Sequence, residues 1–160
     1  MKKTLKKAAL MLACAAVFLA GCDNGYDCSL NNTAYNRMGF YSALTKERYT
    51  HPGPIDVSLM VNGKDSLFIN HITDADEISL PMSYTQDIDT VIFLYEDGMR
   101  DSLYITHSNE PYYQSMECGT LMFHSISEVE HTGVWMEKAA IKNKKVNFKG
   151  NENIKIYFYQ

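Results

Sequence analysis

The sequence predicts an all-β protein: an antiparallel, immunoglobulin-like β-sandwich that follows a cleaved lipoprotein signal peptide. Short runs of alternating apolar and polar residues recur along the chain, separated by turn residues. After the leader, no stretch carries an apolar stripe at helical spacing over three turns. About eight or nine short strands without alternating helices favour a sandwich or barrel over a parallel sheet.

The first residues have the pattern of a bacterial lipoprotein leader. Four lysines lie within the first seven residues, and an uncharged apolar run follows over residues 8–20. That run is short for a membrane span, which needs about 20 residues. It ends in Leu19-Ala20-Gly21-Cys22, the pattern of a lipobox, where the chain is cut before an acylated cysteine. We expect lipidation of Cys22, including palmitate; the alternative is an ordinary secretory signal with an incidental cysteine.

Cleavage there divides the chain into three parts. Residues 1–21 are the signal peptide, residues 22–27 a lipidated tether, and residues 28–160 a single domain, close to the usual domain size. The signal removes four of the 15 basic residues and none of the 19 acidic ones, so the formal charge moves from −4 to −8. Nucleic acid is therefore not an expected partner.

The strand candidates follow in order after the leader. Residues 55–61 alternate, Asn62-Gly63 supplies a turn, and residues 67–69 restart an extended run, which predicts a hairpin. A second hairpin joins residues 90–95 and 103–106 through a polar turn at 96–101. The other candidates are residues 39–44, 78–84, 120–126, 134–141, 146–148 and 154–159. Lysines crowd the last of these segments, as expected for solvated turns and edge strands rather than a binding patch.

Two cysteines, Cys28 and Cys118, remain after the signal and the lipidated residue are set aside. In an exported chain, two distant thiols favour a disulfide over a metal pair. The metal alternative needs Cys118 and His124 on one ion, but an extended segment between them holds their Cα atoms about 20 Å apart. We therefore expect a Cys28–Cys118 disulfide, with His124 packed or hydrogen-bonded.

No pattern in the sequence predicts catalysis. Nucleophile-elbow, phosphate-loop and zinc-protease motifs are absent, so we expect no catalytic, cofactor or metal site and no enzyme. Residues 74–77 carry three acids without the spacing of a calcium loop, and we interpret them as a solvated turn. Asp87 and Asp89 put two acids on one side of an extended segment; such pairs are common on polar strand faces, and the alternative, a glycosidase pair, requires a substrate cleft. His71 and His107 are expected at strand ends, without a catalytic partner.

Aromatic residues leave one binding function open. Tyr112-Tyr113, expected in a loop after Pro111, and the single tryptophan, Trp135, could stack on sugar rings. In β-proteins such residues more often fill cores and cross-strand pairs.

Several segments carry a family resemblance: the lipobox and residues 28–32, 117–124 and 153–158. With these, the chain resembles a family of small Bacteroidales lipoproteins catalogued as a domain of unknown function. The resemblance implies an address in the envelope of a Gram-negative bacterium, with the outer membrane expected and the membrane face open. It implies no catalytic residue.

We therefore expect a non-enzymatic envelope lipoprotein that binds another envelope protein. The segment 153–159 is its candidate edge strand for that partner, although a covered central strand is the alternative. The other function considered is a glycan-binding accessory module at the cell surface.

Overall fold

The computed structural model describes residues 33–116 and 118–159. Its strands are β1 (Tyr35–Ser42), β2 (Ile55–Val61), β3 (Lys64–Ile72), β4 (Glu77–Pro81), β5 (Ile88–Tyr95), β6 (Arg100–Ser115), β7 (Gly119–His131), β8 (Met136–Ile141), β9 (Lys145–Val146) and β10 (Glu152–Phe158). These described residues contain no helix, and so none that could span a membrane.

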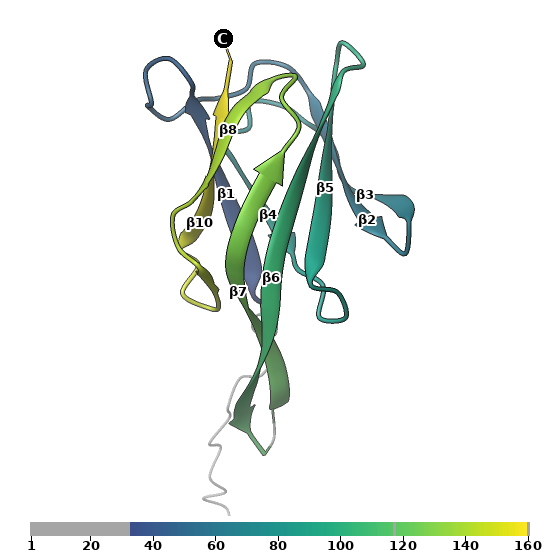
Figure 1. Ribbon diagram of the computed structural model, residues 1–160, viewed down its shortest axis with the longest axis vertical. Coiled ribbons are helices and arrows are strands. Elements are labelled where there is room, and N and C mark those ends of the chain that lie inside the picture. Colours follow the sequence, from purple (N-terminus) through teal and green to yellow (C-terminus); the bar gives the residue numbers. More distant parts are fainter. Residues whose placement is uncertain (1–32, 117, 160) are drawn as a thin grey trace, which may run out of the picture.

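The strands form two sheets that pack as a sandwich (Figure 1). One sheet has the order β4-β1-β10-β8, and the other has the order β3-β2-β5-β6-β7-β9. The predicted all-β sandwich is confirmed. All strand pairs are antiparallel except β1 with β10, which run parallel. The alternation of apolar and polar residues in the sequence predicts strands, but it does not predict the pairing of β1 with β10.

The core lies between the two sheets and is built from alternate strand residues. Phe40 of β1 and Phe158 of β10 meet edge to face, with ring centroids 5.0 Å apart. Phe93 of β5 approaches Phe40 from the opposite sheet at 6.4 Å. All three side chains are fully buried, and burial of each contributes about 1.5–3 kcal/mol relative to exposure. This aromatic cluster fixes how the two sheets face each other.

The first predicted hairpin is confirmed as β2 and β3. Asn62 and Gly63 both have positive φ, 52° and 74°, the backbone conformation of the tight turn that this dipeptide favours. The second hairpin, β5 and β6, is also confirmed, but β6 begins earlier and ends later than its apolar run.

The length of β6 corrects two predictions. Asp101 lies on the strand rather than in the turn, and Tyr112-Tyr113 lie on the strand rather than in a loop. The reason is pairing: β7 accompanies β6 from Leu103 to Ser115, so backbone hydrogen bonds continue past Pro111. Local composition around a proline does not reveal such a partner.

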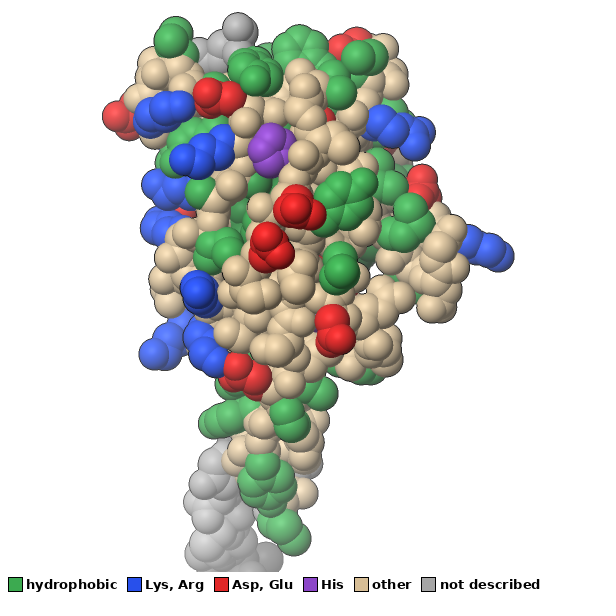
Figure 2. Space-filling view, in the orientation of Figure 1, with side chains coloured by type: hydrophobic (Ala, Val, Ile, Leu, Met, Phe, Trp, Pro, Cys, Tyr) green, Lys and Arg blue, Asp and Glu red, His purple; other side chains and the backbone are tan. Residues whose placement is uncertain are grey.

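The expectation that the C-terminal segment forms a sheet edge is wrong. β10 lies between β1 and β8, so both of its backbone edges are occupied. The alternative, a covered central strand, is confirmed, and the edges of this sheet are β4 and β8. Lys and Arg side chains gather on the side of the molecule where β8 and β10 lie, at the left in Figure 2. Lysines beside an edge strand discourage edge-to-edge association.

Candidate functional site

An open cleft lies at the end of the sandwich where β5 ends and β8 begins. Its volume is about 510 Å³. Three segments line it: the loop between β1 and β2, the last residue of β5 with the turn that follows it, and the residue before β8. The lining residues are Tyr49, His51, Pro52, Gly53, Tyr95, Glu96, Asp97 and Trp135. We call this feature the aromatic cleft.

Its aromatic walls are held against one another by ring contacts. The His51 ring stacks on the Tyr95 ring, with centroids 5.6 Å apart and planes 25° apart. The Trp135 ring meets Tyr95 edge to face at 6.4 Å. Tyr95 is buried, whereas Trp135 keeps 36% of its surface exposed. A ligand in the cleft would therefore meet a fixed aromatic surface.

A buried carboxylate, Asp101 of β6, positions these walls. Its Oδ2 accepts hydrogen bonds from the backbone N–H groups of Trp135 at 2.7 Å and Met136 at 3.0 Å, and from the Tyr95 hydroxyl at 3.2 Å. Its Oδ1 accepts from the Val134 N–H at 2.8 Å and the Thr132 hydroxyl at 3.0 Å. Five donors on one fully buried side chain fix the loop that carries Trp135, because charge-assisted hydrogen bonds are stronger than neutral ones.

The electrostatic character of the cleft is acidic. Burial, followed by the negative charge of Asp101, raises the pKa of Tyr95, so its hydroxyl stays neutral. Asp97 accepts a hydrogen bond from the Trp135 indole nitrogen at 3.0 Å. A Cβ at position 53 would lie 3.4 Å from Glu96 Oε2, so the Glu96 carboxylate lies close above Gly53. Aromatic faces beside carboxylates attract cationic groups.

A second polar cluster joins three neighbouring strands of the larger sheet. His107 of β6 and His124 of β7 are buried, and their rings meet edge to face at 5.3 Å. Asp89 of β5 places Oδ2 3.2 Å from His107 Nε2, without the alignment of a hydrogen bond. His124 Nδ1 donates to Asn109 Oδ1 at 2.7 Å. Burial, then the nearby His107, lowers the pKa of His124 to about 4.

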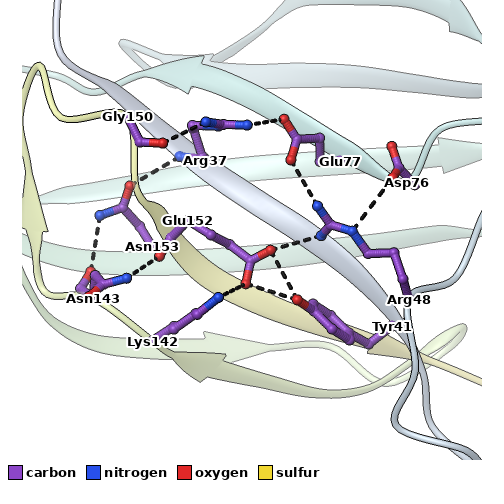
Figure 3. A network of polar contacts seen from close by, with 10 residues as sticks. All are labelled: Arg37, Tyr41, Arg48, Asp76, Glu77, Lys142, Asn143, Gly150, Glu152 and Asn153. Carbon is purple, nitrogen blue, oxygen red and sulfur yellow. Dashed lines mark hydrogen bonds and ion pairs between the residues drawn. The ribbon is translucent and has the colours of Figure 1, made fainter.

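A charged network covers the outer face of the smaller sheet (Figure 3). The Arg48 guanidinium contacts Glu152 at 2.8 Å, Glu77 at 2.9 Å and Asp76 at 3.5 Å. It lies directly over Gly39 of β1, where a Cβ would come within 2.0 Å of Arg48 and 2.1 Å of Glu152. Every acid in the network is paired with a base. We therefore interpret the network as one that holds the loop after β1 against the sheet, and not as a binding site.

The predicted site residues are distributed as follows. Cys22 and Cys28 lie outside the described residues, so the lipidation and the Cys28–Cys118 disulfide stay predictions. The backbone N–H of Cys118 donates to Ser115 Oγ at 3.1 Å, just before β7. The described ranges contain no group of three side chains that could hold a metal ion. The interpretation of His124 as packed and hydrogen-bonded is confirmed.

Other interpretations change. His107 lies in the middle of β6 and has two polar neighbours, so its placement at a strand end is wrong. Residues 74–77 are a turn that runs into β4, but Asp76 and Glu77 are paired with Arg48 rather than only solvated.

Sequence reasoning missed the aromatic cleft. His51, Tyr95 and Trp135 are far apart in the chain, and none belongs to a motif. Asp101 offered one signal: an acid two residues before Leu103, in phase with the buried face of β6. An acidic residue at a buried position needs several donors, which points to a structured partner loop.

The described chain forms a small, sandwich-like all-β domain with an open, aromatic-lined cleft at one end. The chain belongs to the family of unknown function DUF6452, whose family model matches residues 56–158. The match includes Tyr95, Asp101 and Trp135, and it stops short of Tyr49 and His51. Neither the curated proteins nor the solved structures give a match to the chain.

Proposed function

We propose that the mature protein is a non-enzymatic lipoprotein of the cell envelope, lipid-anchored through Cys22 to the outer membrane, that binds another envelope protein in the aromatic cleft. The leader and lipobox support the anchor and the address. The observation that carries the binding role is the aromatic cleft, whose walls are positioned by buried Asp101 before any ligand arrives.

The chemistry of the cleft suits a basic side chain of the partner. An arginine or lysine would lie against Trp135 and His51 with its cationic end near Glu96 and Asp97. Cation–π contacts and desolvated ion pairs of this kind are frequent hot spots of protein interfaces. Because the rings are already fixed in place, binding costs little side-chain ordering on this side of the interface.

A glycan is the second candidate ligand, and one observation favours it. Trp135 is partly exposed beside two carboxylates, so an aromatic face and hydrogen-bond acceptors lie together, as a sugar ring requires. A glycan needs the acceptor atoms of Glu96 and not its charge. This difference separates the two ligands experimentally.

The test compares affinity isolation from native envelopes by the full-length wild type and three variants. Trp135→Ala removes the exposed wall, Glu96→Gln removes one charge, and Tyr84→Ala is a matched aromatic control on the exposed loop between β4 and β5. The partner recovered with wild type is identified by mass spectrometry and then titrated. We expect Trp135→Ala to weaken its binding at least about tenfold, Glu96→Gln to weaken it and flatten its salt dependence, and Tyr84→Ala to have no effect.

Urea unfolding of each variant shows that the fold is intact. A partner bound equally by wild type and Trp135→Ala would refute the cleft as its site. Binding on a glycan array that is lost in Trp135→Ala and retained in Glu96→Gln would support the glycan instead.

A further inference from the structure

The β6–β7 hairpin extends beyond both sheets as a two-stranded arm. The neighbour of β6 in the larger sheet, β5, pairs with it no further than Thr106, and β9 pairs with β7 at His124 and Ser125. Past Asn109 and His124, the two strands pair only with each other among the described residues. Figure 1 shows this arm projecting at the lower end of the molecule.

The arm exposes apolar and amphipathic side chains. Tyr112 is 44% exposed, Tyr113 58% and Met116 89%. At its base, Tyr112 stacks on Phe123 with centroids 4.6 Å apart, and Phe123 contacts Phe148 at 4.9 Å. Figure 2 shows hydrophobic side chains along the visible face of this end of the molecule, among backbone and uncharged polar atoms. An isolated two-stranded hairpin is marginally stable in water, so such a surface indicates a contact that covers it.

The arm contains fewer charged residues than the rest of the protein. Its residues, 110–123, contain two of the 34 Asp, Glu, Lys and Arg residues of the chain: Glu110 at the base, which is paired with Lys145, and Glu117. Residues of this kind are favourable at a membrane interface. Tyrosine places its ring at the level of the headgroups with its hydroxyl in water, and methionine adds an unbranched apolar side chain. A charged arm would lose its hydration there.

The position of the arm places it within reach of the anchor. Thr33, where the described chain begins, lines one cavity together with Thr120, Leu121 and Met122 of the arm. The stretch from Cys22 to Thr33 spans at most about 40 Å when fully extended. An acylated Cys22 therefore keeps the bilayer near the end of the molecule from which the arm projects.

We infer that the arm inserts Tyr112, Tyr113 and Met116 into the headgroup layer of the membrane that carries the anchor, as a second contact that orients the domain. This inference rests on the proposed lipidation of Cys22. In this orientation the aromatic cleft points away from the bilayer. The Trp135 carbonyl accepts a hydrogen bond from the Tyr159 N–H, and in Figure 1 the C-terminus lies at the end of the molecule opposite the arm.

The test uses the full-length acylated protein in vesicles of phosphatidylethanolamine and phosphatidylglycerol, with and without a brominated phosphatidylcholine. The wild type has one tryptophan, Trp135, which serves as the control at the far end. The reporter carries Tyr113→Trp together with Trp135→Phe. We expect brominated lipid to quench the reporter at least about twofold and to leave wild-type fluorescence unchanged, since Trp residues at the interface lie within the reach of the bromines.

Mass spectrometry of the same preparations determines whether Cys22 is acylated. An acylated reporter without quenching would overturn the arm contact and leave the anchor standing. A preparation without acyl chains on Cys22 would overturn the anchor, and the arm contact with it. Urea unfolding confirms that the reporter is folded, and equal quenching of Trp135 in wild type would overturn the upright orientation.

Discussion

At the scale of single residues, Asp101 is the side chain on which most of the site depends. It is a fully buried acid that three backbone N–H groups and two hydroxyls satisfy. Buried carboxylates without such donors are costly, and here the donors all belong to the parts that form or support the aromatic cleft.

We predict that Asp101→Ala destabilises the fold by about 3 kcal/mol or more, because the N–H groups of Val134, Trp135 and Met136 lose their acceptor inside the protein. Asp97→Ala is the control: it removes two hydrogen bonds at an exposed site, one from the Trp135 indole and one from the Met99 N–H, and should cost about 1–2 kcal/mol. Urea unfolding measures both. Equal losses in the two variants would contradict the role assigned to Asp101.

At the scale of elements, the histidine cluster ties β5, β6 and β7 together through Asp89, His107 and His124. The pKa of His124 is lowered from 6.5 to about 4. The unfolded chain therefore binds a proton at this residue as the pH falls below 6.5, while the folded protein does not until the pH nears 4. Folding stability must decrease across that interval.

In the wild type, the free energy of unfolding should decrease as the pH falls from about 6 to about 4.5. We predict that His124→Gln makes this decrease less steep, by up to about 1.4 kcal/mol per pH unit. His131→Gln is the control on the same strand, since His131 lies near the solvent-exposed end of β7. Urea unfolding at several pH values gives the slopes. A wild-type slope in His124→Gln would show that His124 is not the group that titrates.

At the scale of the whole molecule, a Cys28–Cys118 disulfide would fasten the segment before β1 to the base of the turn in the arm. In the chain-entropy model, closing a loop of roughly 90 residues stabilises by about 4–5 kcal/mol. We predict that non-reducing peptide mapping of exported protein recovers this pair, and that reduction lowers the midpoint of urea unfolding. Alkylation of both thiols in the unreduced protein would refute the bridge.

The sequence predicts the local parts of this architecture and not its long-range parts. Alternation over residues 55–61 and the Asn62-Gly63 turn are short-range signals, and they predict the β2–β3 hairpin correctly. The interior position of β10 depends on β1, more than 100 residues away. The aromatic cleft depends on three separate segments meeting at one end of the sandwich, and neither composition nor spacing encodes such a meeting.

The parallel pairing of β1 with β10 also sets the order of events during folding. Met38 lies opposite Ile154 and Phe40 opposite Ile156, so the centre of the smaller sheet joins residues from early and late in synthesis. Strands β5, β6 and β7 pair as a meander of neighbours in sequence, whereas the smaller sheet needs β10 between β1 and β8. Contacts of such large sequence separation slow folding. The smaller sheet therefore cannot close until β10, which lies between β1 and β8, has been made.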